Sequence, residues 1–298
     1  MRVAVTGSSG LIGTALVAAL RADGHLVTRL ARTGPAAPDA LIWDPRAERG
    51  GLDPRSLDGI TAVVHLAGAG IADKRWTGSY QAEIRDSRVG GTRALVAALT
   101  AMAAPPDVLL SGSAIGWYGD TGGREVTEAE PAGHGFLPEV VRDWEAAAGE
   151  AASAGIRVVT LRSGVVLSPG GGILGKLLPL FRLGLGGRIG SGRQVMSWIG
   201  LSEWVAAARF LLGRADITGP VNLTTPNPVT NAEFTSALAA AVHRPALMLV
   251  PAPALKLVVG GVSSDILSSA RVLPQRLLDS GYRFQHPGIA GALAAELG

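Results

Sequence analysis

The sequence contains no cysteine among its 298 residues. This absence excludes disulfides, thiolate zinc sites, iron–sulfur clusters and a cysteine nucleophile. No spacing of histidine, aspartate and glutamate is typical of a metal site either, so we expect no bound metal. The chain is long enough to bury a substantial core without such cross-links.

Long hydrophobic runs are also missing. The most apolar stretch, residues 247–262, is interrupted by two prolines, two glycines and a lysine. A membrane-spanning helix needs about 20 consecutive apolar residues. The first residues enter a strand pattern directly and lack the charged, apolar and cleavage regions of a signal peptide. We therefore expect a cytoplasmic protein without a membrane partner.

Lysine is scarce, because only three of the 27 basic residues are lysines, and the net charge is +3. The arginines are scattered along the chain, and few of them lie beside aromatic residues. Nucleic-acid binding needs a clustered basic face with stacking aromatics. We therefore expect no nucleic-acid partner.

Short apolar segments alternate with helical stretches through the first 167 residues. Strands are predicted at 2–6, 26–30, 41–43, 62–66, 108–110 and 157–161, and helices at 11–20, 80–103 and 137–154. Strands alternating with helices are typical of βαβ units in a parallel sheet. The pattern predicts an α/β, Rossmann-type doubly wound parallel sheet.

The pattern loosens after residue 167, where a segment rich in glycine and leucine begins. We assign residues 1–167 to the nucleotide-binding domain, and we expect residues 195–226 to complete its sheet through a strand at 220–223. Residues 168–194 and 227–298 are assigned to a smaller, mainly helical C-terminal domain that binds the substrate.

Three glycines lie between the first predicted strand and the first helix, in a Gly-x-x-Gly-x-x-Gly spacing. Gly7 permits a sharp turn, Gly10 lets the backbone approach a pyrophosphate, and Gly13 permits close helix packing. The free amides and the dipole at the helix start favour an anion. The cofactor-binding residues predicted in this loop are Gly7, Ser8, Ser9, Gly10, Leu11, Ile12 and Gly13.

The end of the second strand predicts the type of dinucleotide. NAD-binding proteins place an acidic residue there for the ribose hydroxyls, whereas NADP-binding proteins place basic and small polar groups. Residues 28–33 contain no acid, and strand alternation puts Arg32 at the carboxyl end, beside Thr33. The guanidinium fork suits a 2′-phosphate. The sequence therefore predicts that the cofactor is NADP(H).

Several longer motifs carry a resemblance to a known family. They lie at 65–68 (HLAG), 71–76 (IADKRW), 111–119 (SGSAIGWYG), 142–145 (RDWE), 161–167 (LRSGVVL), 190–199 (GSGRQVMSWI), 219–222 (GPVN) and 271–277 (RVLPQRL). With these motifs the chain resembles, over nearly its whole length, the extended short-chain dehydrogenases/reductases of the NAD-dependent epimerase/dehydratase superfamily. It is most similar to the "epimerase family protein" subgroup, whose members have their own C-terminal domain and have at times been labelled cell-division inhibitors.

The resemblance implies a Rossmann domain, NADP(H), and a C-terminal domain closing over the nicotinamide, and it implies no particular substrate. It leaves a homodimer open. It also assigns loops to parts of the cofactor. The residues implied are Leu66, Ala67 and Gly68 toward the ribose and nicotinamide, Asp44 toward the adenine, and Arg162, Ser163, Gly164 and Val165 at the nicotinamide end.

The catalytic Tyr-x-x-x-Lys pair that short-chain dehydrogenases usually carry is absent. In that pair a lysine lowers the tyrosine pKa, so that the phenol can exchange a proton with the substrate oxygen. The chain has three tyrosines, and the residues four positions after them are Ile84, Gly122 and His286. An enzyme with this sequence would therefore need another arrangement of groups for proton transfer.

Other residues are candidates for the missing chemistry. Ser113 lies where related enzymes use a serine on the substrate oxygen, and Tyr118 follows on the same loop. Lys74 could replace the missing ammonium or, with Arg75, clamp an anionic substrate. Trp76 and Trp198 are predicted to contact the substrate. Two carboxylates on the helix at 137–154, Glu139 and Asp143, could act as general acid/base if buried.

Two functions remain open at this stage. The first is an NADP(H)-dependent oxidoreductase or epimerase acting on a small polar, anionic substrate. The second is an NADP(H)-binding sensor or scaffold protein without hydride chemistry, in which the cofactor binds two conformations with different affinity. The intact cofactor loop, Ser113 and the Lys74–Arg75 pair favour the first, and the missing catalytic pair is the reason for the second.

Overall fold

The computed structural model describes residues 1–32, 39–46, 51–250 and 268–298. The predicted cofactor residue Thr33 lies outside the described residues, as does most of the apolar stretch at 247–262. Within the described part of the chain, no helix is both long and apolar enough to cross a membrane.

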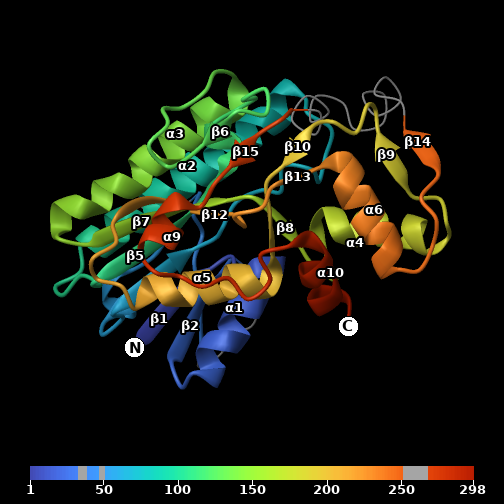
Figure 1. The fold of residues 1–298 in the computed structure, drawn as a ribbon. Coiled ribbons are helices and arrows are strands. Elements are labelled where there is room, and N and C mark those ends of the chain that lie inside the picture. The colour runs from blue at the N-terminus through green and yellow to red at the C-terminus, as the bar shows by residue number, and fades with distance from the viewer. Residues whose placement is uncertain (33–38, 47–50, 251–267) are drawn as a thin grey trace.

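A seven-stranded sheet forms the centre of the larger unit (Figure 1). All six neighbouring pairs are parallel, and the strand order is β12-β7-β5-β4-β1-β2-β3. The strands are β1 (Arg2–Thr6), β2 (Leu26–Ala31), β3 (Ala40–Ile42), β4 (Ala62–His65), β5 (Val108–Ala114), β7 (Arg157–Ser163) and β12 (Gly219–Leu223). The predicted Rossmann-type α/β fold is confirmed.

Helices cover both faces of this sheet (Figure 1). On one face lie α1 (Leu11–Ala22) and α5 (Leu201–Leu212), and on the other α2 (Gly78–Thr100) and α3 (Phe136–Gly149). Side chains alternate along β1, so that Val3 and Val5 pack toward α1 and α5, and Ala4 packs toward α2. Two apolar cores therefore pack against the sheet from both sides, as expected for strands that are mainly apolar.

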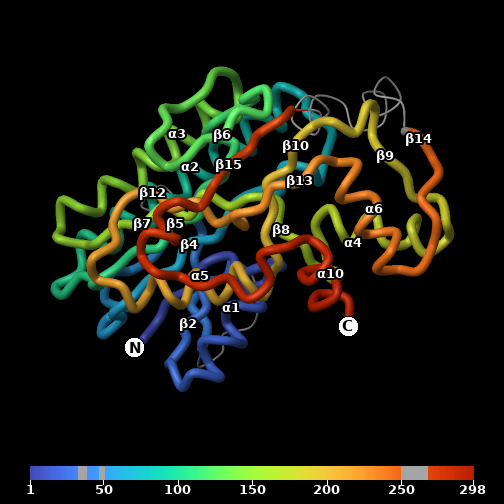
Figure 2. The backbone as a smooth tube through the Cα atoms, in the orientation of Figure 1, coloured from blue at the N-terminus to red at the C-terminus, as the bar shows by residue number. Residues whose placement is uncertain are grey.

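A smaller unit contains α4 (Gly172–Arg182), α6 (Asn231–Ala241) and α10 (Ile289–Leu297), and it lies at the right of Figure 2. Its separate core includes Phe181, Phe234 and Leu293. The Thr230 hydroxyl accepts a hydrogen bond from the Glu233 amide at the start of α6, and the Glu233 carboxylate caps in return. Two short strands, β9 (Gly187–Ile189) and β14 (Met248–Val250), pair at its edge.

The chain passes between the two units more than once. After residue 268 it returns to the larger unit, where Leu277, Tyr282 and Phe284 pack in the core beside α1 and α5. This part of the predicted C-terminal domain therefore packs on the larger unit. The remaining elements are η1 (Pro54–Leu57), η2 (Ile115–Trp117), β6 (Glu125–Val126), η3 (Glu150–Ala154), β8 (Val165–Leu167), β10 (Val195–Met196), β11 (Trp198–Gly200), β13 (Val229–Thr230), β15 (Arg271–Val272) and α9 (Gln275–Asp279).

Candidate functional site

A sharp turn at Gly7 joins β1 to α1. Gly7 has φ +64°, and a Cβ there would lie 2.7 Å from the backbone of Leu66. A Cβ at Gly13 would lie 2.2 Å from the Gly7 carbonyl oxygen, so α1 packs directly on the turn. Among the described atoms, a Cβ at Gly10 would meet only that oxygen, at 3.3 Å. The turn is thus closed at Gly7 and Gly13 and has space at Gly10, which fits a pyrophosphate.

The start of α1 leaves its backbone amides available. Gly10 is the N-cap residue and supplies no side-chain cap, and the first turn of α1 carries no acid. Ser8 is buried, Ser9 is exposed, and Leu11 and Ile12 are half-buried. Unpaired amides at a helix start, with the helix dipole behind them, form an anion site.

A row of hydrogen bonds marks the carboxyl edge of the sheet. Thr6, at the end of β1, lies with its Oγ1 2.7 Å from Nδ1 of His65, at the end of β4. Nε2 of His65 lies 3.0 Å from Oγ1 of Thr92 on α2. The amides of Leu66 and Ala67 donate to the Thr6 hydroxyl at 3.0 and 3.2 Å. Burial lowers the pKa of His65 to about 4, so this imidazole is neutral and structural.

The two arginines near the end of β2 have different environments. Arg29 pairs with Asp39, with Nε 3.1 Å from Oδ2. Arg32 is exposed and forms no ion pair within the described residues, so its guanidinium can bind a ligand. Asp44 lies two residues beyond β3, where its Oδ1 accepts a hydrogen bond from the Arg46 amide at 2.9 Å. The end of β2 therefore offers a cation and no carboxylate to an adenosine ribose.

The turn between β7 and β8 is tightly packed. The Ser163 hydroxyl accepts a hydrogen bond from the Trp204 indole at 2.8 Å. A Cβ at Gly164 would lie 2.8 Å from the Ser197 carbonyl oxygen, and the Val165 amide donates to the same oxygen at 2.9 Å. These contacts fix the backbone of residues 163–165, which were predicted to lie at the nicotinamide end of the cofactor.

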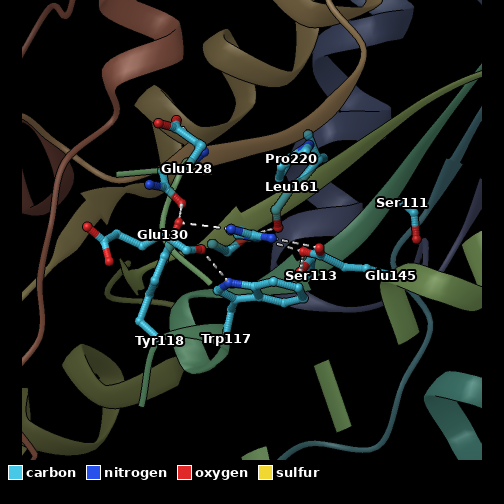
Figure 3. Close-up of polar contacts among 12 residues, drawn as sticks. Ser111, Ser113, Trp117, Tyr118, Glu128, Glu130, Glu145, Leu161 and Pro220 are labelled. Carbon is cyan, nitrogen blue, oxygen red and sulfur yellow. Dashed lines mark hydrogen bonds and ion pairs between the residues drawn. The ribbon is translucent and has the colours of Figure 1, made fainter. Parts of the chain in front are cut away.

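A buried ion pair lies behind the end of β5 (Figure 3). Nε of Arg162 is 2.8 Å from Oε1 of Glu145, and Nη2 is 2.9 Å from Oε2. The Ser113 hydroxyl donates to the same Oε1 at 2.6 Å. The Arg162 guanidinium also lies 3.9 Å from the centre of the Trp117 ring. Arg162, predicted from the family resemblance as a cofactor residue, thus binds Glu145 and lies over the Trp117 ring.

Tyr118 joins the same network. Its hydroxyl accepts a hydrogen bond from Nη1 of Arg162 at 3.0 Å and donates to Oδ1 of Asn222 at 2.8 Å (Figure 3). Burial raises the pKa of Tyr118 to about 12, although the nearby Arg162 opposes the rise. A phenol with that pKa exchanges protons poorly near neutral pH. The geometry therefore favours a packing role for Tyr118.

The other candidate substrate residues follow the loop after β4. Nζ of Lys74 lies 3.1 Å from Oε2 of Glu83, and the Lys74 side chain is 63% exposed. Arg75 is exposed, and no partner within the described residues holds it. The Trp76 indole donates to the Ile71 carbonyl at 2.7 Å. Lys74 is thus neutralised by a carboxylate, whereas Arg75 remains available to an anion.

Comparison with known proteins assigns the family. The model of the NAD dependent epimerase/dehydratase family matches residues 3–223, and a domain of unknown function matches residues 250–296. An epimerase family protein of Mycobacterium bovis is 46% identical over 292 residues, which cover 98% of this chain and 96% of the relative. The chain belongs to the NAD dependent epimerase/dehydratase family.

Solved structures of family members have the same fold. The human epimerase family protein SDR39U1 (isoform 2), solved with NADPH, has a TM-score of 0.90 and 35% identity, and the match covers 99% of this chain and 98% of that one. A nucleoside-diphosphate sugar epimerase from Corynebacterium glutamicum has a TM-score of 0.83 and 36% identity, covering 100% of this chain and 58% of that one.

The helix after β5, α3, carries apolar residues on its face toward η2. Its residues one and two turns before Glu145 are Val141 and Leu137, which face Gly116 in η2 and cannot carry protons. Glu139 is exposed, and Asp143 pairs with Arg85 near the surface. These two acids were candidates only if they were buried, and neither of them is.

Some residues were placed differently, or missed, by sequence reasoning. Trp198, predicted to contact the substrate, is completely buried in the core of the smaller unit. Glu145, the last residue of the motif at 142–145, was not predicted as a site residue, yet it accepts hydrogen bonds from both Ser113 and Arg162. The signal that could have identified Glu145 is its place one helical turn after Val141, on the helix face toward η2. Within the described residues, no group of three or more potential ligands is placed to hold a metal.

Proposed function

We propose that this chain is an NADP(H)-dependent oxidoreductase acting on a small polar, anionic substrate. The observation that carries the proposal is the glycine turn at residues 7–13, which has space for a diphosphate at Gly10. Arg32, without an ion pair within the described residues, follows β2, the strand that pairs with β1. The relative solved with NADPH supports the same cofactor for this chain.

The residues present fit the cofactor in three places. The amides at the start of α1 would bind the diphosphate, and Arg32 would bind the 2′-phosphate. The backbone at 66–68 and 163–165 would border the ribose and nicotinamide. When bound, the nicotinamide supplies or accepts a hydride.

Ser113 would position the reacting oxygen of the substrate. A carboxylate only accepts hydrogen bonds, so the Ser113 hydrogen points to Glu145 at 2.6 Å. The Ser113 oxygen therefore retains only acceptor capacity, which suits a substrate hydroxyl as the hydrogen-bond donor. Arg75, exposed and unpaired within the described residues, would bind the anionic part of the substrate.

Epimerisation by transient oxidation is the second reaction within this proposal. It needs a group that removes and returns a proton at the same oxygen. The apolar residues Leu137 and Val141 make the helix after β5 unsuited to that step. A redox sensor without turnover is a separate candidate, and the same apolar face favours it.

A substrate screen tests the oxidoreductase. Purified protein is incubated with NADPH and a panel of aldehydes, ketones and keto acids, and with NADP+ and the matching alcohols and nucleotide sugars, while reduced nicotinamide is followed. We expect turnover of at least one hydroxy/carbonyl pair, which Ser113→Ala reduces while NADPH still binds. NADPH binding without turnover in the whole panel, together with different affinities for NADP+ and NADPH, would support the sensor instead.

A further inference from the structure

Arg88, on α2, is a cation without a carboxylate partner in the described part of the chain. Its Nη1 donates to the Ala69 carbonyl at 2.8 Å and to the Ile84 carbonyl at 3.3 Å. The guanidinium carbon lies 5.2 Å from the Trp144 ring centre. Neither Nε nor Nη2 has a partner within the described residues. Two nitrogens of the guanidinium, which carry three N–H donors, therefore remain to be satisfied.

Neighbouring arginines on α2 differ from Arg88 in this respect. Arg85 pairs with Asp143, and Arg93 lies 3.4 Å from Glu150, both at the surface. Arg88 is half-buried, and its burial lowers its pKa to about 10. A partly buried cation that lacks a counter-charge is costly for the protein alone. Its place in the fold is explained if an anionic ligand supplies that charge.

The position of Arg88 relative to the sheet indicates which anion. Thr92, one helical turn later, is hydrogen-bonded to His65 at the end of β4. Arg88 therefore lies about one turn, roughly 5 Å, nearer the start of α2, just beyond the carboxyl edge of the sheet. A Cβ at Gly68 would lie 3.5 Å from the Arg88 guanidinium. Ligands of open parallel sheets bind at this edge.

The loop after β4 contacts both Arg88 and the glycine turn. Gly68 contacts the Arg88 side chain. The backbone of Leu66 and Ala67, which precede it in the chain, contacts Gly7. The turn at residues 7–13 contains no cation of its own and offers only amides and hydroxyls. A diphosphate brings two negative charges to this turn. Within the described residues, Arg88 contacts the loop that borders this turn and keeps guanidinium donors free.

We propose that Arg88 is a diphosphate-binding residue of the NADP(H) site, reaching past Gly68 with its free guanidinium donors. This inference rests on the proposed cofactor. It adds a charge from α2 to a site that the sequence assigned to the glycine turn and Arg32. The Trp144 ring, 5.2 Å from the guanidinium carbon, contributes a cation–π contact that restricts the side chain.

Titration of NADPH into the full-length protein tests this role, with Arg88→Gln as the variant and Arg93→Gln as the matched control on the same helix. Loss of a charged hydrogen-bond donor lowers affinity about tenfold to a hundredfold. We expect that loss for Arg88→Gln and none for Arg93→Gln. Arg88→Lys, which keeps the charge and loses the fork, should fall between the two. Far-UV circular dichroism checks that each variant is folded.

A second ligand separates the diphosphate from the rest of the cofactor. Adenosine 2′-monophosphate carries the 2′-phosphate and no phosphate at the 5′ position, so Arg88→Gln should weaken its binding much less than that of NADPH. Equal NADPH affinity in wild type and Arg88→Gln overturns the inference and assigns the cation to another anion, such as that of the substrate. If Arg88→Gln does not fold, wild-type affinity in Arg88→Lys overturns it. Absence of NADPH binding by the wild-type protein overturns the proposed function itself.

Discussion

The guanidinium of Arg162 holds the carboxylate of Glu145 through two hydrogen bonds, of 2.8 and 2.9 Å, with 3% and 11% of the two side chains exposed. This pair fastens α3 to β7. It also fixes the oxygen to which Ser113 donates. The pair therefore determines that Ser113, at the end of β5, can act only as a hydrogen-bond acceptor toward a further group.

Removing one partner of this ion pair should strongly destabilise the folded protein. Arg162→Leu leaves the Glu145 carboxylate buried and unpaired, which costs about 3–5 kcal/mol in the free energy of unfolding. Urea denaturation measures the change. The exposed pair of Arg93 and Glu150 is the control, and Arg93→Leu should cost at most about 1 kcal/mol. Similar losses in both variants would contradict a special role for the buried pair.

The glycine turn can be tested by adding a single methyl group. Gly7→Ala places a Cβ 2.7 Å from the Leu66 backbone and should abolish measurable NADPH binding. Gly24 has φ +79° and nothing within 4 Å of its Cβ position among the described atoms. Gly24→Ala should therefore cost only about 1 kcal/mol of stability and retain the cofactor. Equal NADPH affinity in both variants would argue against the turn as the diphosphate site.

Stability should depend on pH through His65. Its pKa is lowered to about 4 in the folded protein, below the unfolded value of 6.5. The unfolded chain therefore binds more protons between these values, and folding is weakened as the pH falls. From pH 7 to pH 5 the loss should be about 2 kcal/mol, levelling off below pH 4. Urea denaturation at several pH values measures it, and His65→Gln should flatten this dependence. An unchanged slope in that variant would mean that other groups cause it.

Tyr118 should contribute to stability and not to proton transfer. Tyr118→Phe removes hydrogen bonds to Arg162 and Asn222, with a cost of about 1–3 kcal/mol. Because its pKa is raised to about 12, the pH profile of any turnover should be the same in the variant. A shifted or lost limb of that profile would assign proton transfer to Tyr118.

The sheet and the cofactor turn could be predicted because their signals are local. Short apolar runs such as 62–65 mark buried strands, and the Gly7-to-Gly13 spacing lies between one strand and one helix. The helix α4 was not predicted, since glycines precede it and Pro179 lies within it. Its apolar residues, including Leu174, Leu178 and Phe181, nevertheless repeat at helical spacing and fill the smaller core.

The site beyond the cofactor depends on contacts between distant parts of the chain. Glu145 and Arg162 are 17 residues apart, on a helix and a strand, and only packing of α3 on the sheet brings them together. Arg88 resembles Arg85 and Arg93 in the sequence, and only the loop above it distinguishes it. Residue type and spacing could not reveal these relationships.

Cofactor preference should depend on Arg32. Arg32→Glu replaces the cation at the end of β2 by the carboxylate that NAD-binding proteins use for the ribose hydroxyls. We expect NADPH affinity to fall at least about tenfold and NADH affinity to stay or rise. Calorimetric titration of both nucleotides measures the ratio. Arg29→Glu, at the neighbouring arginine paired with Asp39, serves as the control.

The most direct measurement is calorimetric titration of the wild-type protein with NADPH and with NADH under the same conditions. The account predicts saturable binding of one NADPH per chain, at least about tenfold tighter than NADH, because a charge-assisted contact to the 2′-phosphate is worth more than about 1.4 kcal/mol. Equal affinities would contradict the role of Arg32. No saturable binding of either nucleotide would contradict the cofactor site as a whole.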